Sequence, residues 1–213
     1  MQEIPSQDAW VAAQAQRHGT SLQQRFASST VAICGLGGLG SNIALALSRT
    51  GIGKLILIDF DRVDLANLHR QQYKATQIGM YKTDALAQNL LEIAPYVELK
   101  KQTCRLTPDN LVLLLKDADI ICEAFDQPEE KAMLINGVFE KLPQKYLVAA
   151  SGMAGLSSGN GIKTRQVTKR FILCGDETSE ASEKSSLFAS RVMLCAAHQA
   201  HAVVRLIAGE HCD

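Results

Sequence analysis

The sequence has no long hydrophobic run and no excess of charge of either sign. Apolar runs such as Leu111 to Leu115 and Ile56 to Ile58 are far shorter than the roughly 20 residues that a helix needs to cross a bilayer. Because 22 basic and 22 acidic side chains balance, we expect neither a nucleic acid nor a membrane as the main partner. The first residues contain no apolar segment typical of a signal peptide, so we expect a cytoplasmic protein.

Paired cysteines are also missing: the chain has six cysteines, and no two of them form a C-x-x-C pair. They are Cys34, Cys104, Cys122, Cys174, Cys195 and Cys212. Most lie in apolar segments, where a reduced cysteine packs as a small hydrophobic residue. We therefore expect a reduced protein without a structural zinc site.

Neither an internal repeat nor a domain linker interrupts the 213 residues, which suffice for one α/β domain with a sizeable core. Within this single domain, 1–213, we expect an N-terminal helical segment over 1–28 and a Rossmann-like core over 29–150. A loop, edge strands and a C-terminal helix are expected over 151–213. Predicted strands alternate with helices, which favours a mainly parallel sheet with helices on both faces.

A glycine-rich stretch organises the predicted core. Val31 to Cys34 is apolar and β-branched, as in a buried strand, and a G-x-G-x-x-G pattern of Gly35, Gly37 and Gly40 follows it. Asn42 to Arg49 then has a helical pattern. Such glycines permit a tight turn and let backbone N–H groups approach a phosphate at the helix N-terminus.

Polar side chains follow two further predicted strands. Leu55 to Ile58 reads as a buried strand that ends in Asp59, whose carboxylate can accept ribose hydroxyls. The segment from Asp59 to Gln71 is dense in polar residues, and Asp126 follows a third buried strand, Ile120 to Cys122. Because the carboxyl ends of parallel strands meet at one edge of a sheet, we expect these side chains to converge on a nucleotide.

The remaining elements are expected from the same periodic patterns. Helices are predicted at Gln7 to Gln16, Leu22 to Phe26, Met80 to Ala94, Thr107 to Lys116, Glu129 to Leu142 and Leu187 to Ala208, and strands at Val97 to Gln102 and Tyr146 to Ala150. Thr107 is the expected N-cap of its helix. Glycine and serine favour a mobile loop over Ser151 to Gly161; Lys163 to Cys174 is expected to form a hairpin or edge strands, and Gly175 to Ser186 to be exposed.

The pattern resembles the ThiF/MoeB/HesA family, the ubiquitin-activating-enzyme-like adenylyltransferases. The matching segments are Gly35-Leu36-Gly37-Gly38-Leu39-Gly40-Ser41, Asp59-Phe60-Asp61-Arg62-Val63-Asp64, Asn67-Leu68-His69-Arg70-Gln71, Gly79 to Lys82 and Ala124-Phe125-Asp126. The resemblance is closest to the short ThiF group of thiamine biosynthesis, which carries segments like Ala149 to Gly155 and Cys174-Gly175-Asp176.

This resemblance implies ATP-dependent adenylation of the C-terminal glycine carboxylate of a small ubiquitin-like sulfur-carrier protein (ThiS-like), with release of pyrophosphate, for thiamine thiazole biosynthesis. ATP and Mg²⁺ are the implied cofactors, and a homodimer is the implied assembly. A carboxylate is already ionised at neutral pH, so the reaction needs no general base. It needs cations and backbone N–H groups placed in advance around the phosphates.

The resemblance also implies the site residues. Arg70, Lys82 and Asp126 are the implied catalytic residues of each chain, and Asp126 would also coordinate Mg²⁺. The implied nucleotide-binding set is Gly35, Gly37, Gly38, Gly40, Asp59, Asp61, Asn67, Arg70, Gln71 and Lys82. An N-terminal arginine would reach the γ-phosphate across the dimer, with Arg17 as the candidate and Arg25 as the reserve.

Each of these residues has a plainer interpretation when it is taken alone. Arg70 could pair with Asp64, Lys82 could be a solvated lysine, and Asp126 could cap the helix that begins near Pro128. Two other features are expected to be structural. His198 and His201 are expected to pack or to interact with the helix dipole, because no third metal ligand accompanies them. Cys174 is the nearest candidate to receive an activated carrier, but a structural role is at least as well supported.

Three other functions are consistent with a glycine loop of this type. The first is an NAD-dependent oxidoreductase, although nothing downstream resembles a hydride-transfer site. The second is a regulatory relative that binds the nucleotide without catalysis. The third is a dehydratase that activates a carboxylate on a modified tRNA base, against which the zero net charge weighs mildly.

Overall fold

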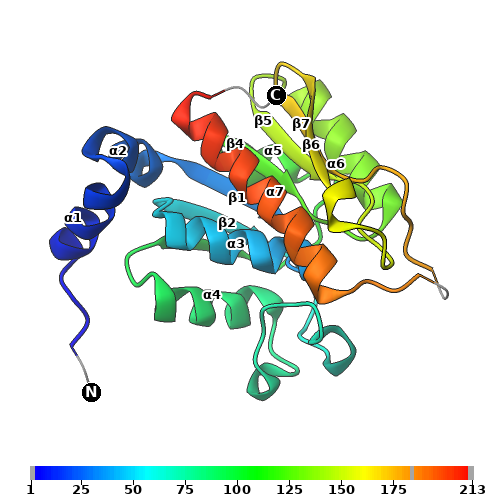
Figure 1. Cartoon of the computed structure of the whole chain (residues 1–213), viewed down its shortest axis with the longest axis horizontal. Helices are drawn as coiled ribbons and strands as arrows, with labels where there is room; N and C mark the ends of the chain where they lie inside the picture. The colour runs from blue at the N-terminus through cyan, green and yellow to red at the C-terminus, as the bar shows by residue number, and fades with distance from the viewer. Residues whose placement is uncertain (1–2, 183–184, 211–213) are drawn as a thin grey trace.

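A seven-stranded sheet forms the centre of the computed structural model, which describes residues 3–182 and 185–210; Cys212 lies outside the described residues (Figure 1). The strand order is β3-β2-β1-β4-β5-β7-β6. The strands are β1 (Thr30–Cys34), β2 (Lys54–Ile58), β3 (Glu98–Gln102), β4 (Ile120–Glu123), β5 (Tyr146–Ala150), β6 (Lys163–Thr168) and β7 (Phe171–Gly175). All neighbours are parallel except β6, which pairs antiparallel with β7. The expected mainly parallel α/β fold is confirmed.

Helices cover both faces of this sheet. The α-helices are α1 (Gln7–His18), α2 (Thr20–Ser28), α3 (Gly38–Thr50), α4 (Lys82–Ile93), α5 (Leu111–Leu115), α6 (Pro128–Lys141) and α7 (Ala189–Ala208). Short 3₁₀ turns in the described residues are η1 (Leu65–Asn67), η2 (Ala75–Gln77) and η3 (Gly159–Gly161). Figure 1 shows α7 and α3 crossing one face side by side, and they pack together there; α5 and α6 lie on the other face.

The strands are apolar because both of their faces are buried. Val31 and Ile33 of β1 point into the core beneath α3, α4 and α7, whereas Ala32 and Cys34 point into the core beneath α5 and α6. A strand buried on both faces has no polar positions in its alternation, which explains the unbroken apolar run before the glycine loop.

The N-terminal helices lie at one edge of the molecule (Figure 1). The chain breaks between them at Gly19, whose φ is 88°. No described residue of α1 is buried, whereas α2 buries Phe26 in the core. Arg25 at the end of α2 donates a hydrogen bond to the carbonyl of Ala208 at the end of α7, with a distance of 2.8 Å.

Two expectations differ from the structure. The fifth helix begins at Leu111 rather than near Thr107, because the side chain of Asn110 accepts the Thr107 N–H at 2.8 Å and closes a separate turn. Thr107 is therefore not the N-cap. The segment 151–161 is not an unsupported loop, since Ala154 is buried within it and its backbone is tied to neighbouring segments.

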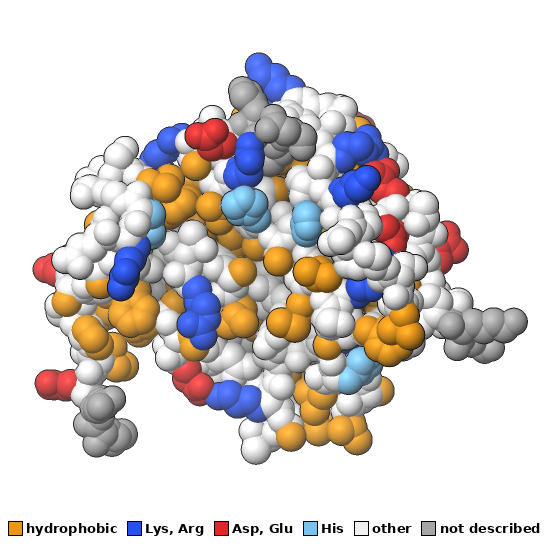
Figure 2. All heavy atoms as spheres, viewed as in Figure 1, with side chains coloured by type: hydrophobic (Ala, Val, Ile, Leu, Met, Phe, Trp, Pro, Cys, Tyr) orange, Lys and Arg blue, Asp and Glu red, His pale blue; other side chains and the backbone are white. Residues whose placement is uncertain are grey.

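One face carries α7, and Figure 2 shows apolar side chains spread across it between basic and histidine side chains. Met193 and Leu194 of α7 are among the exposed apolar residues of the protein. Across residues 3–182 and 185–210, no helix combines the length and the apolar character needed to cross a membrane.

Candidate active site

A cavity of about 1030 Å³ opens at the carboxyl ends of the central strands. Residues that follow β1, β2, β4 and β5 line it, together with the first residues of α3 and α4. Ten of the lining residues are predicted from the sequence for nucleotide binding or for the metal: Gly35, Gly37, Gly38, Asp59, Asp61, Asn67, Arg70, Gln71, Lys82 and Asp126. The predicted convergence of these residues at one edge of the sheet is therefore present in the fold.

The glycine loop is shaped by close backbone packing. Gly35 has a φ of 91°, and a Cβ added to it would lie 2.7 Å from the carbonyl oxygen of Ala124. A Cβ on Gly40 would lie 1.9 Å from the carbonyl oxygen of Gly35, so neither position accepts a side chain. Gly40 is absent from the cavity wall, and its role is to let α3 approach β1.

The N-terminus of α3 is suited to an anion. Its N-cap is Gly37, which supplies no side-chain cap, and the first turn contains no acidic residue. The first backbone N–H groups of a helix have no partner within the helix, and the helix dipole adds positive potential there. Gly37 and Gly38 line the cavity at this point, which is the arrangement expected for a phosphate.

Asp59 is buried at the end of β2 and braces the glycine loop. One carboxylate oxygen accepts the N–H of Leu36 at 2.6 Å, and the other accepts the N–H of Asp61 at 2.7 Å. Burial raises the pKa of the Asp59 carboxyl, although nearby Lys82 and these hydrogen bonds oppose the rise. Each oxygen keeps acceptor capacity for a further donor such as a ribose hydroxyl.

Lys82 is a buried, paired cation rather than a solvated lysine. It begins α4, only 5% of it is exposed, and its Nζ lies 2.7 Å from an oxygen of Asp61. The same Nζ is 3.8 Å from Asp59. The plainer interpretation of this residue is thereby excluded, and the cavity gains a positive charge held at its edge.

Three further predicted residues, Asn67, Arg70 and Gln71, lie on the segment after β2. Arg70 forms no ion pair with Asp64 in the described part of the chain, and Asp64 instead caps η1 through the N–H of Ala66. The oxygen of the Gln71 side chain is buried at the cavity without a hydrogen-bond partner. An unpartnered buried acceptor is costly, so it marks a position at which a ligand donor would be accommodated.

Asp126 is exposed at the cavity mouth after β4. It is not the cap of the next helix, because α6 has Gln127 as its N-cap and Pro128 as its first residue. Within residues 3–182 and 185–210, no group of three or more histidine, cysteine or acidic residues could hold a metal by itself. A single carboxylate fits Mg²⁺, which is commonly bound by one or two carboxylates together with substrate phosphates.

Lys131 at the cavity wall pairs with the buried Glu123 at the end of β4, a contact that was not predicted from the sequence. Glu123 is fully buried, and both of its oxygens lie 2.9 Å from Nζ of Lys131, which lines the cavity. Burial raises the pKa of the Glu123 carboxyl, and Lys131 opposes the rise. A charged residue that ends an apolar strand, with a lysine eight positions later, was the available signal.

Five predicted candidates lie elsewhere. Arg17 is exposed on α1 and does not line the cavity of its own chain, while Arg25 is occupied at the end of α7. Cys174 is fully buried in β7, so a carrier cannot reach its sulfur in this conformation. His198 pairs with the hydroxyl of Thr164 at 2.8 Å, and His201 is exposed.

One protein family matches almost the whole chain. The model of the ThiF family matches residues 11–213. The adenylyltransferase and sulfurtransferase UBA4 of Scheffersomyces stipitis is 38% identical over 132 residues, which are 62% of this chain and 29% of that protein. The ubiquitin-like modifier-activating enzyme 5 of Arabidopsis thaliana is 48% identical over 84 residues, 39% of this chain and 20% of that protein. The chain thus spans less than a third of each of these relatives.

Among solved structures, the chain has the fold of E. coli tRNA N6-threonylcarbamoyladenosine dehydratase in complex with ATP. The TM-score is 0.86 at 21% identity, over 97% of this chain and 98% of that one.

Proposed function

Because the chain belongs to the ThiF family, we propose that it is an ATP-dependent adenylyltransferase that activates a carboxylate with release of pyrophosphate. The observation that carries the proposal is the convergence of a glycine loop, a buried acid, a buried cation and a second acid in one cavity. The residues are Gly35, Gly37 and Gly38 of the glycine loop, with Asp59, Lys82 and Asp126. The nucleotide would lie with its ribose at Asp59 and its phosphates at the N-terminus of α3.

In the proposed reaction, a carboxylate oxygen attacks the α-phosphorus of ATP. The new O–P bond forms as the bond between the α-phosphorus and the bridging oxygen breaks, and that oxygen leaves with pyrophosphate. Two anions must approach each other, and negative charge shifts onto the departing oxygen. Arg70 and Lys82 are the cations that would offset both, and Lys82 would exchange its contact with Asp61 for a phosphate oxygen.

Asp126 is the residue that would hold Mg²⁺ against the phosphates. The bound ion would supply positive charge that neutralises the phosphate oxygens. Lys131 would support this position from below, because it keeps the buried Glu123 neutralised and also donates to the carbonyl of Phe125, beside Asp126.

We further propose that the carboxylate belongs to the C-terminal glycine of a small ubiquitin-like sulfur carrier of the ThiS type, in thiamine thiazole biosynthesis. The chain would act as a homodimer in which Arg17 of one copy approaches the γ-phosphate bound by the other. The exposed position of Arg17 on α1, away from the cavity of its own chain, supports a role across an interface. No described residue of α1 is buried, which leaves the helix available for such a contact.

The proposal is tested by pyrophosphate exchange into ATP with a panel of purified carriers that end in Gly-Gly. Exchange that requires Mg²⁺ and one carrier is the expected result. Thermal unfolding provides a carrier-free measurement, since a ligand that binds only the folded state raises the melting temperature. Mg·ATP should raise it and NAD should not. Stabilisation by NAD alone would instead favour an oxidoreductase, and exchange driven only by a carboxylate-bearing tRNA would favour a dehydratase.

A further inference from the structure

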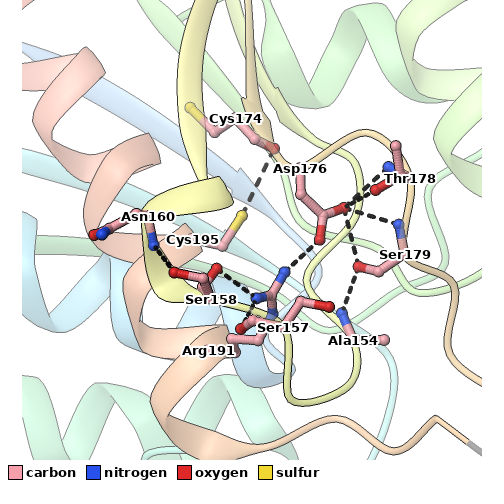
Figure 3. A network of polar contacts seen from close by, with 10 residues as sticks. All are labelled: Ala154, Ser157, Ser158, Asn160, Cys174, Asp176, Thr178, Ser179, Arg191 and Cys195. Carbon is pink, nitrogen blue, oxygen red and sulfur yellow. Dashed lines mark hydrogen bonds and ion pairs between the residues drawn. The ribbon is translucent and has the colours of Figure 1, made fainter.

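A buried arginine ties together three segments on the side of the cavity that faces away from β2. Arg191 lies in the first turn of α7 and is only 4% exposed. Figure 3 shows its guanidinium between the carboxylate of Asp176, which follows β7, and the carbonyl groups of Ser157 and Ser158. The bond to Ser158 measures 2.9 Å.

Asp176 extends this network into the loop that follows β5. Its second carboxylate oxygen accepts the N–H groups of Thr178 and Ser179 at 2.9 and 2.8 Å. The hydroxyl of Ser179 also donates to that oxygen and in turn accepts the N–H of Ala154 at 3.0 Å (Figure 3). A Cβ on Gly152 would lie 2.1 Å from the same oxygen, so the loop passes too close for any side chain there.

The network therefore fixes one wall of the cavity. Gly152, Ala154 and Ser179 all line the cavity. Their backbones are held by a buried ion pair whose fork of donors fixes direction as well as distance. The two loops are joined again by the N–H of Asp176, which donates to the carbonyl of Gly152 at 2.9 Å.

This wall is separate from the residues proposed for the nucleotide. The strand order places β5 and β7 on the far side of β4, whereas the glycine loop and Asp59 follow β1 and β2. A second hollow of about 450 Å³ adjoins the wall and shares Ala154 and Ser179 with the main cavity. At its outer side lie Leu156, which is 83% exposed, and Phe188, which is 41% exposed.

We propose that Arg191 is a positioning residue for the carboxylate-bearing substrate: by holding residues 151–158 it shapes the passage along which an extended polypeptide tail reaches the α-phosphate. This inference rests on the function proposed above. The passage begins at the exposed apolar side chains of Leu156 and Phe188, continues along the serine-rich hollow and ends in the cavity. Its small lining residues suit a narrow tail of small residues. The passage follows β5 and β7 whereas Asp59 follows β2, so we expect nucleotide affinity to be independent of it.

The test compares Arg191→Ala and Arg191→Lys with the wild-type chain. Three quantities are measured: the Kd for mant-ATP without carrier, the KM for a Gly-Gly-ending carrier in pyrophosphate exchange, and amide hydrogen exchange over residues 151–158. Arg165→Ala is the matched control, because Arg165 forms an exposed ion pair with Glu177 on the same loop but does not line the cavity.

For Arg191→Ala we expect a carrier KM raised about tenfold to a hundredfold, the range that misplacement of about 1 Å can produce. The Kd for mant-ATP should stay within about twofold, and hydrogen exchange over 151–158 should accelerate. Arg191→Lys should be intermediate, since an ammonium can keep Asp176 but lacks the planar fork that also reaches both carbonyl groups. The Arg165→Ala control should change none of the three.

An equal loss of ATP and carrier affinity would overturn the inference, and so would an unchanged carrier KM. If Arg191→Ala does not fold, Asp176→Asn gives the same readouts, because it removes the charge at nearly constant shape. Wild-type protein that exchanges pyrophosphate with no carrier would refute the proposed function and this inference with it. Active wild-type protein with unaffected variants would refute the role of Arg191 alone.

Discussion

The ammonium of Lys82 lies 2.7 Å from a carboxylate oxygen of Asp61 at the edge of the cavity. The two side chains differ in burial, because Asp61 is half exposed while Lys82 is buried. Water can therefore solvate the Asp61 carboxylate once Lys82 leaves it. A triphosphate carries more negative charge than one carboxylate and can replace Asp61 as the partner of Lys82. The contact with Asp61 would thus hold the lysine in place before the proposed nucleotide binds.

This relationship predicts different kinetic effects for two neighbouring residues. Lys82→Ala should lower kcat for pyrophosphate exchange by about 100- to 1000-fold, because its contact strengthens as charge develops in the transition state. Asp59→Asn should mainly weaken ATP binding, because the ribose does not change during the reaction. Steady-state exchange kinetics separate the two, with thermal unfolding as the check on folding. A Lys82→Ala variant altered only in KM for ATP would rule out the transition-state role.

The dimer proposal predicts complementation between two inactive variants. Arg17→Ala and Asp126→Ala should each abolish exchange, and the exposed Asp126 should cost less than about 0.5 kcal/mol of stability. Mixing equal amounts and allowing subunits to exchange should restore roughly a quarter of the wild-type rate, since half of the dimers are mixed and each has one intact site. Activity that stays absent, in a mixture shown to contain mixed dimers, would mean that Arg17 does not act across the interface.

Asp176 predicts how stability depends on pH. Burial pushes its pKa upward, but hydrogen bonds from Ser179 and Thr178 together with Arg191 lower the pKa to about 2, below the usual value of 3.8. The folded state therefore releases this proton more readily than the unfolded chain, so the carboxylate stabilises the fold above pH 4 and the benefit is lost as the pH falls toward 2. The contribution is roughly 2 kcal/mol at neutral pH.

Urea unfolding measures this contribution directly. The gap in free energy of unfolding between wild type and Asp176→Asn should be widest near pH 7 and should narrow between pH 4 and 2. Lys100→Met is a suitable control for pH-dependent surface effects. Lys100 lies on the partly exposed edge strand β3, and its Nζ is 3.5 Å from a carboxylate oxygen of Asp117. A gap that does not vary with pH would contradict the assigned pKa of Asp176.

Leu156 predicts a surface effect on carrier affinity. Leu156→Glu should raise the carrier KM about tenfold while leaving ATP affinity unchanged, because it places a charge at the proposed entrance of the passage. Stability should be unaffected, since the side chain is 83% exposed. Leu113→Glu is the matched control, because Leu113 is also an exposed leucine, with 65% of it accessible. It lies on α5, which covers the face of the sheet opposite to α7. Equal effects of the two changes would argue against a specific entrance.

The fold and the nucleotide side of the cavity were predictable because their signals are local. The apolar run before Gly35 and the acid after Ile58 report strand ends within a few residues, and parallel strands bring those ends together. The roles of the individual residues, and the partner arginine, remain predictions. Asp61 was predicted to bind nucleotide, and its contact with Lys82 adds a second role that spacing alone does not indicate.

The cavity wall held by Arg191 and Asp176 was not predictable, because its contacts are not local in the sequence. The contact of Arg191 with Asp176 joins the first turn of α7 to the irregular segment after β7, 15 positions earlier, and the periodicity of α7 does not indicate which side chain its arginine meets. Glycine and serine between residues 151 and 161 favoured a mobile loop, yet Gly152 is small because an oxygen of Asp176 occupies the space of its side chain. Composition shows that small residues are present. It does not show whether they make the backbone flexible or let neighbouring segments pack closely.

The reaction rates of the buried cysteines can measure how often each part of the core opens. Burial raises the pKa of Cys34 well above its usual value and that of Cys195 to about 12, so neither thiol reacts with a disulfide reagent until the chain around it opens. Cys34 lies beneath α5 and α6, whereas Cys195 lies on α7 at the other face. The rates at which the reagent labels the two sulfurs therefore report whether the cores on the two faces of the sheet open together or separately, and no cysteine has to be introduced.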